Sequence, residues 1–227
     1  EKKEKDAWIN LMKVISHELL NSITPIRSIC QNLEDLVEQD SLSTEDLEDI
    51  KNSVQTMLRR SDHLQKFVEG YRKLAMLPSP KKEKAELQHL VDNCIQTMNP
   101  LFKKNNIEVT NAVAQNILIN VDSQQIEQVI INLLTNSINA LENSNLKQIS
   151  ISAEAKNNRV FIKVSDSGKG IEKEIEEKIF LPFFTTRTEG AGIGLTLSKN
   201  IIEAHGGYIS HKRENNTTVF EISLVED

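Results

Sequence analysis

The segment Val14-Ile15-Ser16-His17-Glu18-Leu19-Leu20-Asn21 lies early in a long stretch with helical periodicity. Apolar residues recur there at intervals of mostly three and four, the spacing of one buried helix face. They are Trp8, Met12, Ile15, Leu19, Ile26, Cys30, Leu33 and Val37. His17 falls between two of these positions and therefore points to the solvated side, with Asn21 one turn further on. Taken alone, the pattern favours an ordinary surface histidine over an available nucleophile.

The pattern around this segment predicts a helix from about residue 1 to residue 37, followed by a short loop. Ser43-Thr44-Glu45-Asp46 then resembles a capping box that opens a second helix. Its apolar seam follows a three-four alternation, as in a coiled coil or helical bundle. The seam is Leu47, Ile50, Val54, Met57, Ser61, Leu64, Val68, Tyr71 and Ala75. Since one helical hairpin covers such seams poorly, we expect two chains to pair as a four-helix bundle.

After Pro78-Ser79-Pro80 the pattern changes to mixed helices and strands, which predicts a linker and then an α+β domain. Asp122 is expected to cap a helix, and Asn157-Asn158 to form the turn of a hairpin. The predicted helices are 87–103, 123–142 and 195–205. The predicted strands are 107–112, 117–120, 148–155, 159–165, 208–213 and 217–224.

The composition, with a formal net charge of −6, gives no sign of a nucleic-acid surface. No apolar run approaches the roughly 18 residues of a membrane span, so no membrane contact is expected from this part of the chain. Cys30 and Cys94 are single and far apart, and we expect two small buried residues rather than a disulfide or a metal pair. Because the charged run at residues 1–6 begins abruptly, we expect a fragment of a longer chain.

The helix predicted at 123–142 has an apolar stripe and a second stripe made of amides. The apolar residues are Ile126, Val129, Ile130, Leu133, Leu134 and Leu141. The amides are Gln125, Gln128, Asn132, Asn136 and Asn139. Amide oxygens can ligate Mg²⁺ without adding charge, which suits a metal already carried by a triphosphate. A merely polar helix face is the alternative.

Three further motifs follow in the second half of the chain. Asp166-Ser167-Gly168-Lys169-Gly170 comes directly after a strand, so its carboxylate could accept a hydrogen bond from an exocyclic amine, although Asp-x-Gly is also common in turns. The segment Phe180–Arg187 suits a hydrophobic loop anchor whose final arginine could reach a phosphate. Gly190, Gly192 and Gly194 open a helix, where backbone can approach phosphates. Their spacing and late position exclude a Rossmann fingerprint, and no Walker motif is present.

In this combination and order, the motifs resemble those of sensor histidine kinases of two-component systems, over about residues 7–225. The segments are a histidine box (16–21), an asparagine box (132–136), two glycine boxes (166–170 and 190–194) and a phenylalanine box (180–187). The resemblance implies a dimerisation and phosphotransfer hairpin at 1–77, a linker at 78–84 and, at 85–227, an ATP-binding domain of the Bergerat type, an α/β sandwich.

The resemblance also implies the roles of individual residues. In the hairpin, His17 is the phosphoacceptor, Glu18 its orienting acid or base, and Asn21 the amide of a regulator phosphatase motif. In the second domain, Asn136 and Asn132 would hold Mg²⁺, Asp166 would read adenine, and Thr218 would touch adenine. The pocket floor and the phosphate side are assigned to Gly168, Gly170, Arg187, Gly190, Gly192 and Gly194.

The implied function is an ATP- and Mg²⁺-dependent histidine kinase that forms homodimers and passes its phosphoryl group to a response-regulator receiver domain. Its implied location is cytoplasmic, as part of a larger sensor. Ser22 and Pro25 make the histidine box similar to the nitrogen-regulation-like branch, whereas Asn139 and Leu181 stand where many members have Lys and Glu.

Two alternatives remain. One is another Bergerat-fold ATPase of the chaperone, topoisomerase or mismatch-repair groups, and Asn132 opposes it because those groups place a Glu base there. The other is a non-catalytic dimeric scaffold, which the intact glycines, Asp166 and Asn136 oppose.

Overall fold

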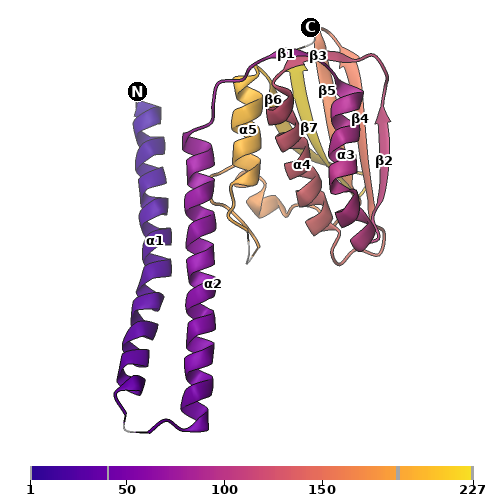
Figure 1. The fold of residues 1–227 in the computed structure, drawn as a ribbon. Coiled ribbons are helices and arrows are strands. Elements are labelled where there is room, and N and C mark those ends of the chain that lie inside the picture. Colours follow the sequence, from indigo (N-terminus) through magenta and orange to yellow (C-terminus); the bar gives the residue numbers. More distant parts are fainter. Residues whose placement is uncertain (1, 40, 188–189, 226–227) are drawn as a thin grey trace. The chain divides into compact units, whose positions relative to one another are not determined.

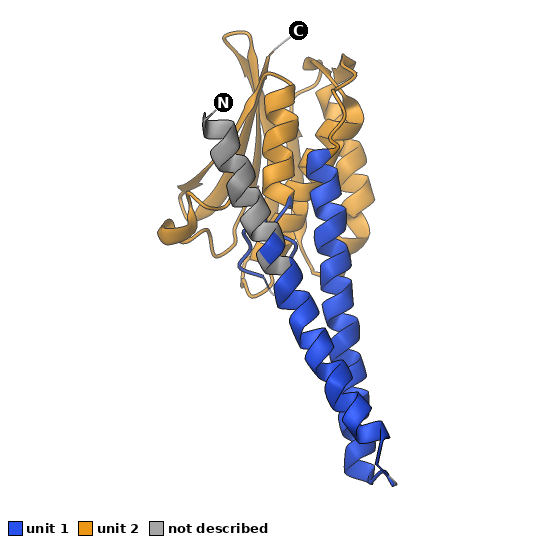
Figure 2. Ribbon diagram, turned by 90° about the vertical axis from the view of Figure 1, so that its left-hand side faces the viewer, with its two compact units in different colours: residues 1–75, 182–193 blue, residues 76–181, 194–227 orange. Residues whose placement is uncertain are grey.

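The computed structural model describes residues 2–39, 41–187 and 190–225, without the side chains of residues 2–15, 17 and 18. The chain divides into two compact units, coloured separately in Figure 2. The first contains residues 1–75 and 182–193, and the second contains residues 76–181 and 194–227. Residues 182–193 thus group with the helical hairpin, which the division predicted from sequence did not anticipate.

The first unit contains the two predicted long helices, α1 (Lys2–Val37) and α2 (Thr44–Ala75) (Figure 1). The predicted capping box is confirmed at the start of α2. The Ser43 N–H donates to Oδ2 of Asp46 at 2.7 Å, and the Asp46 N–H donates to Oγ of Ser43 at 3.1 Å. These reciprocal bonds satisfy backbone donors that the first helical turn leaves without partners.

The hairpin alone leaves much of its apolar surface exposed. Leu20 is 63% exposed, Leu47 56% and Leu58 60%, although a lone hairpin gains most of its stability by covering such groups. Cys30 is also exposed, with its Sγ 3.5 Å from Sδ of Met57, so the expectation that it is buried was wrong. Cys30 belongs to the predicted apolar face of α1, which a single hairpin covers only in part.

The second unit has a five-stranded sheet in the order β2-β4-β5-β7-β6, in which only the β2–β4 pair is parallel. Figure 1 shows α3, α4 and α5 on one face of this sheet. A separate antiparallel pair joins β1 and β3. The helices are α3 (Leu87–Lys104), α4 (Ser123–Ala140), α5 (Gly194–Ala204) and a short 3₁₀ turn, η1 (Lys173–Ile175). The strands are β1 (Glu83–Glu86), β2 (Glu108–Val113), β3 (Leu118–Val121), β4 (Gln148–Lys156), β5 (Arg159–Asp166), β6 (Tyr208–Glu214) and β7 (Thr217–Val225).

The α+β class and the predicted helices and strands are confirmed, while β1 and η1 were not predicted. The core lies between the helices and the sheet. The apolar stripe predicted for α4 is fully buried, and on β5 the alternation buries Val160, Ile162 and Val164. Asp166 is the next residue on this inward-facing side and is only 2% exposed. The period of the strand therefore carries a carboxylate into the edge of the core.

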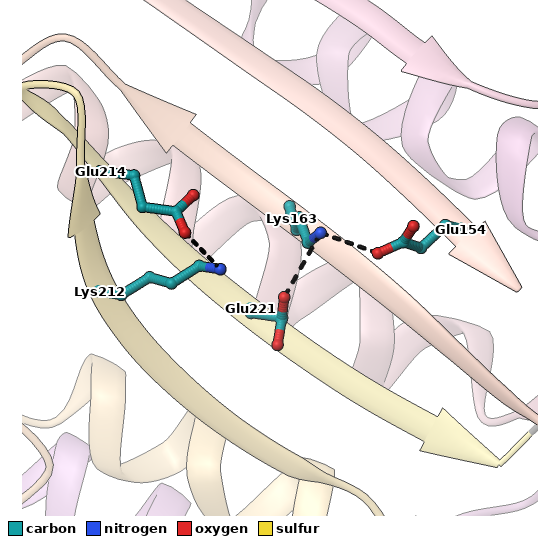
Figure 3. Close-up of polar contacts among 5 residues, drawn as sticks. All are labelled: Glu154, Lys163, Lys212, Glu214 and Glu221. Atoms are coloured by element: carbon teal, nitrogen blue, oxygen red, sulfur yellow. Dashed lines mark hydrogen bonds and ion pairs between the residues drawn. The ribbon is translucent and has the colours of Figure 1, made fainter. Parts of the chain in front are cut away.

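The other face of the sheet carries cross-strand ion pairs (Figure 3). Nζ of Lys163 lies 2.9 Å from Oε1 of Glu154 and 3.6 Å from Oε2 of Glu221. Lys212 and Glu214, both on β6, form a further pair at 2.8 Å. Such partly exposed pairs contribute little to stability, and they mark this face as solvated. A bilayer-crossing helix would need a long apolar stretch, and none of the helices in the described part of the chain has one.

The predicted linker is attached to the second unit through Asp122 and His205. The Asp122 side chain caps α4, as predicted, by accepting from the Gln125 N–H at 3.2 Å, and it also accepts from the Lys81 N–H at 3.0 Å. The latter bond is the main cause that lowers the pKa of Asp122. The Asp122 N–H donates to Nε2 of buried His205 at 3.0 Å, while Nδ1 lies 2.7 Å from the Ile201 carbonyl oxygen. This arrangement requires the neutral tautomer with its proton on Nδ1.

Candidate functional site

The carboxylate of Asp166 lies at the end of β5, where it accepts two hydrogen bonds. Oδ1 accepts from the Gly168 N–H at 2.9 Å, and Oδ2 accepts from the Ser137 hydroxyl at 3.1 Å. Burial raises the pKa of Asp166, and this effect exceeds the lowering by the two donors and by the positive charge of Arg213. Each carboxylate oxygen keeps further acceptor capacity. Asp166 can therefore bind a ligand that donates a hydrogen bond.

Thr218 lies directly opposite Asp166 in the pairing of β5 with β7. It is 4% exposed, and its Oγ1 has no hydrogen-bond partner among the described residues. A buried hydroxyl without a partner costs free energy and is uncommon in folded proteins. Cross-strand neighbours have Cβ atoms only about 4.5–5.5 Å apart. The carboxylate and the hydroxyl thus form one polar set at the edge of an apolar core.

Two glycines follow this carboxylate in the turn after β5. A Cβ on Gly168 would lie 2.7 Å from Oδ1 of Asp166 and 2.8 Å from the carbonyl oxygen of Ala140, so no larger residue fits without a shift. Gly170 has φ +84°, and its missing side chain leaves space for the Arg213 guanidinium. The turn after β5 therefore depends on glycine for two different reasons, close approach at the first and backbone conformation at the second.

The amide stripe of α4 divides into residues with different partners. Nδ2 of Asn139 donates to the Thr135 carbonyl at 2.6 Å, and Nε2 of Gln125 donates to the Pro78 carbonyl at 3.0 Å. Nδ2 of Asn132 donates to Oγ of Ser198 on α5 at 2.8 Å. No hydrogen bond from the described residues reaches the side chain of Asn136, which is half-buried.

Asn132 also lies against the first residue of α5. A Cβ on Gly194 would collide with its Oδ1, so the glycine permits this close approach. The predicted metal-ligand region of α4 and the N-terminus of α5 are therefore adjacent. Backbone N–H groups at such a helix start favour anions.

The donor chemistry of α4 fits a magnesium ion that brings phosphate ligands of its own. Asn136 and Asn132 are one helical turn apart, and amide oxygens are suitable hard ligands. Because Ser198 accepts from the nitrogen of Asn132, the oxygen of that amide is left to act as a ligand. Within the described ranges, no group of three or more His, Cys, Asp or Glu residues is arranged to hold a metal.

The remaining predicted residues belong to the first unit. His17 and Glu18 are in α1, but their side chains lie outside the described part, and Asn21 is exposed on the same helix. The Arg187 N–H donates to Oγ1 of Thr185 at 3.1 Å, and Thr185 also lies against Gly190.

Within the first unit, the end of the phenylalanine box packs on α2. The rings of Phe183 and Phe67 have centroids 4.4 Å apart, and Phe67 is buried. Gly192 has φ +65° and approaches the backbone of Phe183, while Ile193 packs against Gly70 of α2. The contacts agree with the predicted role of this segment as a hydrophobic anchor for a loop.

Sequence reasoning did not identify Ser137, Ser198 or Arg213 as neighbours of these residues. Ser137 had a recognisable signal, since it lies four residues after Leu133 and four before Leu141 in the apolar stripe. A lone hydroxyl in such a stripe requires a buried partner. Ser198 and Arg213 come from elements distant in sequence, and no local pattern marks them.

Comparison with known proteins gives concordant results. Residues 121–227 match a family model described as histidine kinase-, DNA gyrase B-, and HSP90-like ATPase. The chain is 30% identical to an NtrY-like sensor histidine kinase of Rickettsia felis, over 96% of this chain and 36% of that protein. It is also 30% identical to the sensor histidine kinase ZraS of Salmonella typhimurium, over 99% of this chain and 47% of that protein. The chain therefore spans less than half of the length of either relative.

Two solved structures extend the similarity to the fold. The catalytic domain of the histidine kinase ThkA matches with a TM-score of 0.60 and 33% identity, covering 64% of this chain and 96% of that one. ThkA in complex with the response regulator TrrA matches with a TM-score of 0.69 and 25% identity, covering 100% of this chain and 64% of that one.

Proposed function

Because the chain belongs to the sensor histidine kinases of two-component systems, we propose that it uses ATP to phosphorylate His17 and then passes the phosphoryl group to a response-regulator aspartate. The observation that carries this proposal is the buried pair of Asp166 and Thr218. The carboxylate and the unpartnered hydroxyl lie side by side at the edge of the core, and the polar edge of adenine would supply hydrogen-bond partners to both.

In the nucleotide site, Asp166 accepts a hydrogen bond from the exocyclic amine, and Thr218 supplies its hydroxyl next to the same edge. The start of α5 at Gly194 offers N–H groups to the phosphates. Asn136 and Asn132 would hold Mg²⁺, which when bound neutralises charge on the phosphate oxygens. Arg187, Gly190 and Gly192 are proposed to contact or cover the phosphate end.

Phosphoryl transfer requires a neutral imidazole of His17. Its unprotonated ring nitrogen attacks the γ-phosphorus in line, a nitrogen–phosphorus bond forms, and the bond to the bridging oxygen breaks to release ADP. Glu18 is proposed to accept the proton from the other ring nitrogen, which keeps the product neutral at the ring. Adjacent helical residues do not face each other, so Glu18 must reach the ring through its rotamer.

The amide side chain of Asn132 favours transfer over hydrolysis. A hydrolysing ATPase needs a base to activate water, and an amide whose nitrogen donates to a hydroxyl is a poor base. This supports the kinase over the other Bergerat-fold ATPases. A non-catalytic scaffold would have no use for the buried, unpartnered hydroxyl of Thr218 opposite Asp166.

The test is incubation with γ-labelled ATP and Mg²⁺, for the parent, His17→Gln and the control His89→Gln, which changes an exposed histidine of α3. Acid-labile, alkali-stable label in the parent and the control, absent from His17→Gln, is the expected result. Label that persists in His17→Gln would place the acceptor elsewhere. Transfer of the label to a receiver domain tests the second step.

A regulator phosphatase activity is proposed for the same hairpin. Asn21 lies one helical turn from His17, where its amide can orient water against a regulator's acyl phosphate. Asn21→Ala should slow dephosphorylation of the regulator while autophosphorylation continues. Unchanged dephosphorylation would refute this assignment.

Pairing of two hairpins is proposed from the exposed apolar surface of α1 and α2. A second copy would cover Leu20, Leu47 and Leu58, which the single hairpin exposes. The complex of ThkA with TrrA suggests a receiver domain as a further partner. We place this segment in the cytoplasm as part of a larger sensor, in keeping with the relatives' greater length.

A further inference from the structure

We propose that Ser137 is a positioning residue that sets the preference of this site for a 6-aminopurine over a 6-oxopurine nucleotide, through its hydrogen bond to Asp166. The inference rests on the proposed nucleotide site and adds a residue to it. Ser137 itself need not touch the base.

Ser137 is a buried residue of α4 whose hydroxyl bonds a residue of another element. The residue is 1% exposed and lies among fully buried apolar side chains of the same helix. A helical serine can bond the carbonyl of its own preceding turn. Here the hydroxyl donates instead to Oδ2 of Asp166 at 3.1 Å, from a different element of the fold. A buried hydroxyl that gives up its local partner in this way fixes the orientation of the group that it binds.

The bond also determines what Asp166 offers to a ligand. With the Gly168 N–H on Oδ1 and the Ser137 hydroxyl on Oδ2, both oxygens act as acceptors. An exocyclic amine at position 6 of a purine is a donor and matches them, whereas a 6-oxo group is an acceptor and does not. A protonated Asp166 would present a donor and lose this selectivity.

Other polar groups near Asp166 do not replace Ser137. Arg213 acts on the carboxylate through its charge and lowers its pKa, as Ser137 and Gly168 do, against the larger effect of burial. His211, the preceding inward-facing residue of β6, packs instead between Phe180 and Phe220 and lies 4.0 Å from Glu176. Ser137 is thus the one side chain among the described residues that hydrogen-bonds to Asp166.

The experiment measures ADP and inosine diphosphate binding calorimetrically with Mg²⁺, for the parent, Ser137→Ala and the control Ser144→Ala. Ser144 carries the same hydroxyl just after α4 but bonds only the Ala140 carbonyl, at 3.4 Å. Loss of one hydrogen bond predicts about fivefold to tenfold weaker ADP binding by Ser137→Ala. Inosine diphosphate binding should change less than about twofold, because the removed bond does not favour an acceptor on the ligand. The control should keep the parent's ratio of the two affinities.

Equal losses for the two nucleotides would overturn the proposal, since they would indicate a merely structural role. An unchanged ratio with unchanged affinities would overturn it too. A Ser137→Thr variant, which keeps the hydroxyl, should restore the parent's preference for ADP. If the parent binds neither nucleotide, both the proposed function and this inference are refuted. If the parent binds ADP but Ser137→Ala keeps the parent's ratio of the two affinities, only the role of Ser137 is refuted.

Discussion

Replacement of Asp166 by Asn is the most informative perturbation of the candidate site. The substitution keeps the size of the side chain and lets Oδ1 still accept from the Gly168 N–H. It removes the negative charge and turns the second oxygen into a donor, which opposes an exocyclic amine. A hydrogen bond to a charged group contributes about 1.5–3 kcal/mol, and about 1.4 kcal/mol corresponds to a tenfold change in affinity. Asp166→Asn should therefore weaken ADP binding about 10- to 150-fold.

The same substitution should stabilise the nucleotide-free protein at neutral pH. Burial raises the pKa of Asp166, so the folded state holds the proton to a higher pH than the unfolded state does. Stability then falls as the pH rises through this interval, and the ionised, buried carboxylate is a net cost above it. Asn removes that cost. The advantage should be full above the raised folded-state pKa of Asp166 and should disappear as the pH falls towards the unfolded-state pKa of about 3.9.

Two measurements on the same samples test the predicted loss of ADP affinity and the predicted gain in stability. Calorimetric titration with ADP gives the affinity, and thermal unfolding without nucleotide at several pH values gives the stability. ADP binding by Asp166→Asn equal to that of the parent would refute the assignment of Asp166 to the base. A variant less stable than the parent at pH 8 would show that the two hydrogen bonds outweigh the cost of burial.

Three further predictions concern other parts of the chain. Asp122→Ala removes the cap of α4 and the bond to Lys81, so the free energy of unfolding in urea should fall by about 1–2 kcal/mol; Asp122→Asn, which can still cap, should lose less. Phe67→Ala and Phe183→Ala should be coupled by about 0.5–1.5 kcal/mol in a double-mutant cycle, and additive effects would argue against their ring contact. Burial raises the pKa of the Cys94 thiol to about 12, so in a Cys30→Ser background it should react with a thiol reagent only after unfolding, and rapid reaction at neutral pH would contradict its burial.

The elements that sequence predicted well are those whose signal is local. Asp122 is followed by an amphipathic helix that it caps, and Asn157-Asn158 can adopt the positive φ angles, 55° and 58°, that a two-residue hairpin turn demands. The strand Glu83–Glu86 was not predicted because its mostly charged residues show no apolar–polar alternation. It is a strand because its backbone pairs with that of β3.

The neighbours of the site depended on tertiary contacts. The pairing of Asp166 with Thr218 joins strands separated by about 50 residues of chain, and no local rule gives that register. The grouping of residues 182–193 with the hairpin includes the ring contact of Phe183 with Phe67, which the composition of the segment alone does not indicate. The roles assigned to the site residues from the five sequence boxes stay predictions until the variants are measured.

The place of β7 in the sheet has a consequence for how the chain is synthesised. β7 follows the other strands of this sheet in sequence, yet it lies between β5 and β6, and among the described strands β6 pairs only with β7. While the ribosome has released only the residues before Thr217, β5 keeps an open edge, and exposed strand edges invite pairing with other chains. A stop codon ahead of Thr217 would remove the middle of the sheet rather than its margin, so the shortened product should aggregate.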